Sequence, residues 1–211
     1  MRKTAVALVL LISLLLSAAA SADVLTAMPV ELDPERLEKT TCNARIVGYN
    51  EAQNTLTVHL TVPEIFPTDE LYKISVGDSI YTGGQEILIE SISHDNDWCG
   101  VVGFNDWEIF FFEERDGCYR MADEDCYFWN VIAVIECPVK DHLLLLDYVD
   151  DDTGDMLNLP AVLTARELTV KMLAEQASDR YHIGFAADNV TVTFDGEGNL
   201  AVINRFYVPW Q

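Results

Sequence analysis

The chain has 211 residues, half of them apolar, and carries 35 acidic against 13 basic side chains for a formal net charge of −22. The apolar content excludes wholesale disorder and supplies a core for one domain or two small ones. So negative a field repels nucleic acids and anionic membrane surfaces, which makes nucleic-acid binding the least favoured function. The partner class that this charge favours is a cationic protein or peptide.

Residues 1–22 have the parts of a secretory signal peptide. Arg2 and Lys3 precede an apolar run, and an A-x-A cleavage site ends at Ala22. An uncleaved membrane anchor is the alternative, but no basic stop-transfer cluster follows the apolar run. We expect cleavage after Ala22, which leaves a secreted or periplasmic chain without a membrane span. Its 11 basic and 35 acidic residues give a net charge of −24.

The remaining chain shows no obvious division into domains. Residues 23–41 are polar, contain two prolines and predict an irregular leader. No linker rich in Pro, Gly or Ser interrupts residues 42–211, which therefore predict one β-rich globular domain. A subdivision near residue 95 or residue 140 is the alternative.

Short alternating segments dominate the pattern. Residues 44–62 predict a hairpin that Pro63 ends, because apolar and polar residues alternate strictly in its second half. Residues 107–113 contain three consecutive phenylalanines and predict a largely buried strand. Residues 126–136 predict a central strand, because the core of this segment, Val-Ile-Ala-Val-Ile, is apolar on both faces. Further short strands are predicted at 79–81, 85–92 and 142–147.

Apolar residues recur at helical spacing in one longer segment of the chain. Thr164 and Glu167 form a capping box, and the apolar residues that follow predict a helix near residues 165–177. These apolar residues are Ala165, Leu168, Met172 and Leu173. A single helical turn capped by Thr68 and a closing hairpin over 190–208 complete the prediction. The fold class is mainly β: short antiparallel strands and hairpins forming a barrel or two packed sheets, with one clear helix.

Five cysteines follow the cleavage site, at positions 42, 99, 118, 126 and 137. An exported chain usually meets an oxidising compartment, so we predict a disulfide between Cys118 and Cys126, whose short polar loop joins neighbouring strands. The alternative is that the thiols are buried and reduced. No spacing typical of a structural zinc site is present.

Five aspartates lie between positions 147 and 155. The EF-hand pattern fails, because Val149 stands where the first carboxylate is needed. An irregular calcium site formed by Asp150, Asp152 and Asp155 is one hypothesis. A solvated turn is the favoured alternative, since Asp, Thr and Gly suit turns. No other cofactor is predicted.

Two tryptophans are candidates for exposed contacts with a protein or a glycan. Trp98 lies at a predicted turn and Trp210 lies near the terminus, whereas Trp129 falls within the predicted central strand.

These features favour a non-enzymatic, exported binding protein of the envelope or extracellular space. The alternative is a secreted hydrolase that acts on glycans or peptides with carboxylates on its loops. With 35 acids the sequence singles out no catalytic pair, and the four histidines are scattered, so no catalytic residue is nominated.

Overall fold

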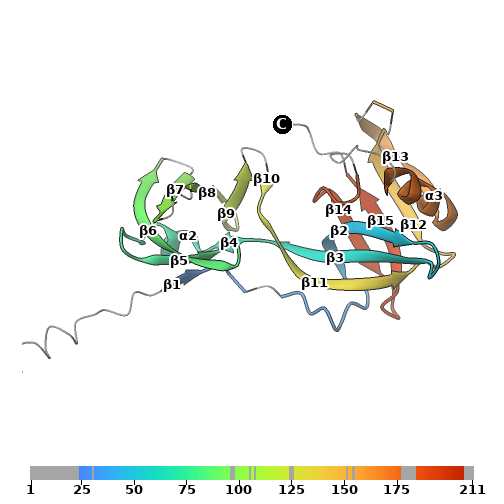
Figure 1. The fold of residues 1–211 in the computed structure, drawn as a ribbon, viewed down its shortest axis with the longest axis horizontal. Helices are drawn as coiled ribbons and strands as arrows, with labels where there is room; N and C mark the ends of the chain where they lie inside the picture. Colours follow the sequence, from blue (N-terminus) through green and yellow to red (C-terminus); the bar gives the residue numbers. More distant parts are fainter. Residues whose placement is uncertain are drawn as a thin grey trace, which may run out of the picture. The chain divides into compact units, whose positions relative to one another are not determined.

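The computed structural model describes residues 24–29, 31–95, 98–104, 106, 108–123, 126–150, 152–153, 155–176 and 184–206. These residues are mainly β, with two sheets, one clear helix and one helical turn, which confirms the predicted fold class. The two-sheet alternative is the one found, since neither sheet closes into a barrel within the described residues (Figure 1).

The described chain divides into two compact units, each built from two segments. Unit 1 comprises the described parts of Met1–Met28 and Glu64–Phe128, and unit 2 those of Pro29–Pro63 and Trp129–Gln211. Each unit has its own sheet and its own apolar core.

Unit 1 contains an eight-stranded sheet in the order β1-β5-β6-β7-β8-β9-β10, with β4 paired to β9. Its strands are β1 (Val24–Thr26), β4 (Ile65–Phe66), β5 (Ser79–Thr82), β6 (Gln85–His94), β7 (Trp98–Gly103), β8 (Glu108–Glu114), β9 (Gly117–Asp123) and β10 (Cys126–Tyr127). The rings of Phe66 and Phe111 meet edge to face in its core, with centroids 5.0 Å apart. The helical turn α2 (Thr68–Leu71) is present, but Pro67 and not Thr68 occupies its N-cap position.

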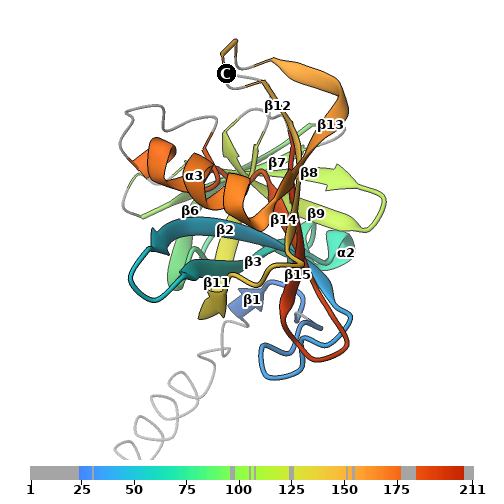
Figure 2. The same ribbon diagram turned by 90° about the vertical axis from the view of Figure 1, so that its right-hand side faces the viewer.

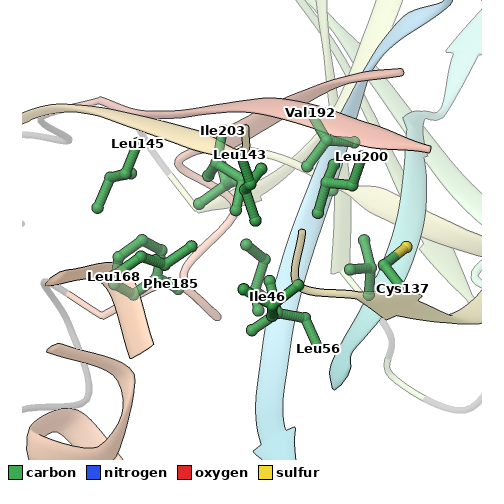
Figure 3. Close-up of a cluster of buried hydrophobic side chains, with 14 of the residues drawn as sticks. Ile46, Leu56, Cys137, Leu143, Leu145, Leu168, Phe185, Val192, Leu200 and Ile203 are labelled. Carbon is green, nitrogen blue, oxygen red and sulfur yellow. The ribbon is translucent and has the colours of Figure 1, made fainter. Parts of the chain in front are cut away.

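Unit 2 contains a seven-stranded sheet in the order β11-β3-β2-β14-β15-β12-β13. Its strands are β2 (Thr41–Asn50), β3 (Thr55–Pro63), β11 (Trp129–Pro138), β12 (Leu144–Val149), β13 (Met156–Thr164), β14 (Val190–Phe194) and β15 (Leu200–Arg205). Helix α3 (Ala165–Gln176) lies across one face of this sheet (Figure 2). Leu168 of α3 lies beside Phe185, and side chains from the strands point toward the pair (Figure 3).

The capping box of α3 is confirmed. The Thr164 backbone N–H donates to Glu167 Oε2 at 2.8 Å, and the Glu167 N–H donates back to Thr164 Oγ1 at 3.4 Å. The hydrogen bonds that the Thr164 N–H and the Thr164 hydroxyl donate to Glu167 Oε2 lower the pKa of the Glu167 carboxyl. Leu168 and Met172 are buried as predicted, but Leu173 is 39% exposed because it lies on the outer flank of the helix.

The predicted central strand over 126–136 is wrong in two respects. Phe128 separates β10 from β11, and among the described strands β11 pairs only with β3, at an edge of the unit 2 sheet. Val131 and Val134 of β11 are accordingly 43% and 59% exposed. A run of β-branched residues favours a strand but does not say how many neighbours that strand has.

Candidate functional site

The most distinctive surface of unit 1 is a row of aromatic side chains, which we call the aromatic face. It consists of Trp98, Phe110, Phe112, Tyr119 and Tyr127. Strand β8 contributes rings to this surface because successive side chains of a strand point to opposite faces of the sheet. Ile109 and Phe111 are buried in the core, whereas Phe110 and Phe112 are 41% and 38% exposed.

The strand register carries this row across the sheet. Phe112 lies opposite Trp98 of β7 on one side and opposite Tyr119 of β9 on the other. Tyr127 of β10 lies opposite Met121, two residues beyond Tyr119 on the same face. The ring centroids of Trp98 and Phe110 are 5.8 Å apart, and those of Tyr119 and Tyr127 are 4.6 Å apart. Four adjacent strands therefore contribute to one continuous aromatic surface.

The Trp98 ring packs over a glycine. A Cβ atom at Gly100 would lie 2.8 Å from Trp98 Cζ3 and 2.7 Å from Ser93 Oγ, both closer than real contacts allow. Since glycine lacks that atom, the indole ring lies against the backbone of its own strand. This packing holds Trp98 in a fixed orientation at the end of the row.

Carboxylates border the aromatic face. Glu108 and Glu114 are exposed and bracket Phe110 and Phe112 on the same side of β8. The Tyr127 hydroxyl donates a hydrogen bond to Glu114 Oε1. Rings that are bordered by exposed carboxylates suit a ligand that carries positive charge.

The excess of acidic side chains in unit 1 also favours a ligand that carries positive charge. Residues 64–128 contain 16 acidic and 3 basic side chains. Lys73 is paired with Asp69 at 3.1 Å, and Arg120 is buried with its Nη1 atom 3.5 Å from Glu64. Burial lowers the pKa of Arg120, whose guanidinium also stacks over the Phe128 ring at 3.7 Å. Most of the acidic charge of this unit is therefore not neutralised by basic side chains of the same unit.

One of the two tryptophans predicted as contact residues lies on the aromatic face. Trp98 was a predicted contact residue, and it is half-buried within the aromatic face. Trp210, the second candidate, lies outside the described residues. Phe110 and Phe112 were missed, because three consecutive phenylalanines favoured a buried strand. The informative signal was the placement of Glu108 and Glu114 at even spacing from them, which marks one face as solvent-facing.

The described aspartates between positions 147 and 155 differ in their burial and in their hydrogen-bond partners. Asp147 is 1% exposed and accepts hydrogen bonds from Arg205 and Lys171. Asp150, Asp152 and Asp155 lie in or beside a turn in which Asp150 Oδ1 accepts the backbone N–H of Asp152 at 2.9 Å. Within the described part of the chain, no group of three or more His, Cys, Asp or Glu side chains is placed to hold a metal ion.

We therefore expect calcium to leave the protein unchanged. Asp150, Asp152 and Asp155 belong to no such group in the described ranges, and the favoured interpretation as a turn agrees with the hydrogen bonds of this segment. Addition of millimolar calcium to residues 23–211 should shift the melting temperature by less than about 1 °C, since only a ligand that binds the folded state stabilises it. A saturable rise in melting temperature that Asp152→Asn abolishes would restore the calcium hypothesis.

The structure does not form the Cys118–Cys126 disulfide, and the strand register explains why. Cys126 lies opposite Asp123, five residues along β9 from Cys118. Five residues of extended strand span about 16 Å, whereas bridged Cα atoms lie within about 7 Å. Cys118 is instead buried, and its Sγ lies 3.6 Å from Thr68 Oγ1. The alternative of buried, reduced thiols agrees better with this arrangement.

No helix in the described ranges is long and apolar enough to span a membrane. Comparison with protein-family models, with curated proteins and with solved structures yielded no match, so the aromatic face is interpreted from its own chemistry.

Proposed function

We propose that this chain is an exported binding protein that recognises a cationic protein or peptide through the aromatic face of unit 1. The observation that carries the proposal is the exposed row of rings closed at both ends of β8 by Glu108 and Glu114. Monomeric proteins rarely expose adjoining large apolar side chains without a use for them.

The chemistry of the surface selects the partner. A Lys or Arg head group over an exposed aromatic ring gains about 0.5–1 kcal/mol, and more when the pair is desolvated. Each such head group would also lie within reach of the bordering carboxylates, which add a favourable Coulomb term. The negative charge of unit 1 increases the association rate of a cationic partner before any contact forms. A glycan is the alternative ligand, because sugars also stack on aromatic rings.

An arginine-rich peptide titrated into residues 23–211 by calorimetry tests the proposal. We expect binding that weakens steeply with added salt, since exposed charges are screened within about 10 Å at 0.1 M ionic strength. Replacing Phe110 and Phe112 together with serine should weaken the affinity about tenfold or more, because the cations lose their stacking surface.

Phe206→Ser is the matched control. Phe206 belongs to unit 2 and is 41% exposed, as is Phe110, so its replacement removes one exposed ring from the other unit. Equal affinity in all three proteins would show that the peptide only follows net charge and would contradict the proposal. Salt-independent binding of a neutral oligosaccharide, lost in the Phe110 and Phe112 variant, would assign the face to glycans instead.

A further inference from the structure

The outward-facing side chains of β8 are evenly spaced. They are Glu108, Phe110, Phe112 and Glu114, which occupy every second position of the strand and are all exposed. Each residue of an antiparallel strand advances the chain by about 3.4 Å, so neighbours in this series lie about 6.8 Å apart. Strand β8 therefore presents two rings between two carboxylates in one line, which we call the β8 ladder.

The neighbouring strands widen the aromatic surface at the two middle positions of the β8 ladder. Phe112 lies between Trp98 of β7 and Tyr119 of β9 in the strand register. Phe110 lies opposite Gly100, over which the Trp98 ring packs. The middle positions thus offer a broad stacking surface, whereas each outer position offers a carboxylate.

The spacing of the β8 ladder matches an extended peptide that lies along β8. In such a peptide the side chains of one face also recur at every second residue, about 6.8 Å apart, so one side chain can meet each position. A peptide that crosses the sheet does not match, because neighbouring strands lie about 4.8 Å apart. A helix does not match over four positions, because residues four apart advance by about 6.0 Å and rotate by about 40°, which turns the later side chains away.

We propose that the partner of the aromatic face binds as an extended segment along β8, with positively charged residues at four alternate positions. This inference rests on the proposed function and adds the conformation and the charge spacing of the partner. The two inner residues are arginines, because a planar guanidinium stacks on the Phe110 and Phe112 rings better than a compact ammonium does. The two outer residues pair with Glu108 and Glu114, and either arginine or lysine satisfies these carboxylates.

Two peptides of identical composition test the charge spacing. Both have blocked ends and are titrated by calorimetry into residues 23–211, one as Arg-Ser-Arg-Ser-Arg-Ser-Arg and the other as four arginines followed by three serines. The alternating peptide should bind about tenfold tighter, because the extended block directs only two of its four arginines toward the β8 ladder. Equal affinities would overturn this inference and leave the proposed function standing, whereas no binding of either peptide would contradict both.

Substitutions in the peptide and in the protein test the four positions. Lysine at both inner positions of the alternating peptide should weaken binding about threefold or more, whereas lysine at both outer positions should change it less than about twofold. Glu108→Gln should weaken the alternating peptide about threefold at low salt. Glu113→Gln is the matched control and should leave the affinity unchanged, because Glu113 is exposed on the same strand but points to the opposite face.

Equal losses at the inner and outer peptide positions would overturn the assignment of the arginines to the rings. A loss for Glu113→Gln as large as that for Glu108→Gln would show that the peptide follows net charge, which overturns the β8 ladder as the binding line. Unchanged melting temperatures show that both protein variants remain folded.

Discussion

Replacing Asp147 with asparagine is expected to destabilise unit 2 by about 3–5 kcal/mol, the usual result of removing one partner of a buried ion pair. The Asp147 carboxylate accepts hydrogen bonds from Arg205 Nε and Nη2, both at 2.8 Å, and from Lys171 Nζ. The Arg205 side chain is fully buried, with its guanidinium 4.7 Å from the Phe185 ring. The variant would therefore leave a guanidinium in the core without its counter-charge.

Urea denaturation measures this effect, and Asp152→Asn provides the control. Asp152 belongs to the same acidic stretch but is exposed, so its replacement should change the free energy of unfolding by less than about 0.5 kcal/mol. A loss below about 1 kcal/mol for Asp147→Asn would contradict the structural role of this carboxylate, since a buried pair contributes more than an exposed one.

The second large effect is a loss of stability in alkali. Burial raises the pKa of the Cys99 and Cys137 thiols to about 11, from an ordinary value of 9.0. Above pH 9 the unfolded chain releases these protons while the folded chain keeps them, so the free energy of unfolding falls with rising pH. The fall continues until about pH 11. A shift of two units corresponds to about 2.7 kcal/mol for each thiol.

The free energy of unfolding measured from pH 8 to pH 11 checks this prediction. The variant in which Cys99 and Cys137 are both replaced with alanine should be less stable at pH 8, because two buried side chains are shortened. Its stability should nevertheless fall less steeply above pH 9 than that of the wild type. Identical slopes would mean that these thiols are not protonated and buried in the folded protein.

Local patterns predicted the elements whose residues interact over short distances. The alternation of apolar and polar residues over Thr55–Val62 predicted strand β3, in which Leu56, Val58 and Leu60 are fully buried. The capping box at Thr164 gave the start of α3. Both signals depend on hydrogen bonds and side-chain directions within a few residues, which the sequence displays directly.

Long-range placement could not be predicted in the same way. The chain passes between the two units at residues 28–29, 63–64 and 128–129, where no linker composition marks the change. The exposure of Phe110 and Phe112 depends on which face of β8 meets the core. The burial of Asp147 depends on Arg205, which lies 58 residues away in the sequence. Sequence spacing carries no information about such partners.

An NMR titration of isotope-labelled residues 23–211 with an arginine-rich peptide tests whether the aromatic face binds cationic partners. We expect chemical-shift changes concentrated on Trp98, Phe110, Phe112, Tyr119 and Tyr127, and their loss when Phe110 and Phe112 are replaced with serine. Shift changes spread evenly over the acidic residues of both units, or confined to unit 2, would contradict binding at the aromatic face.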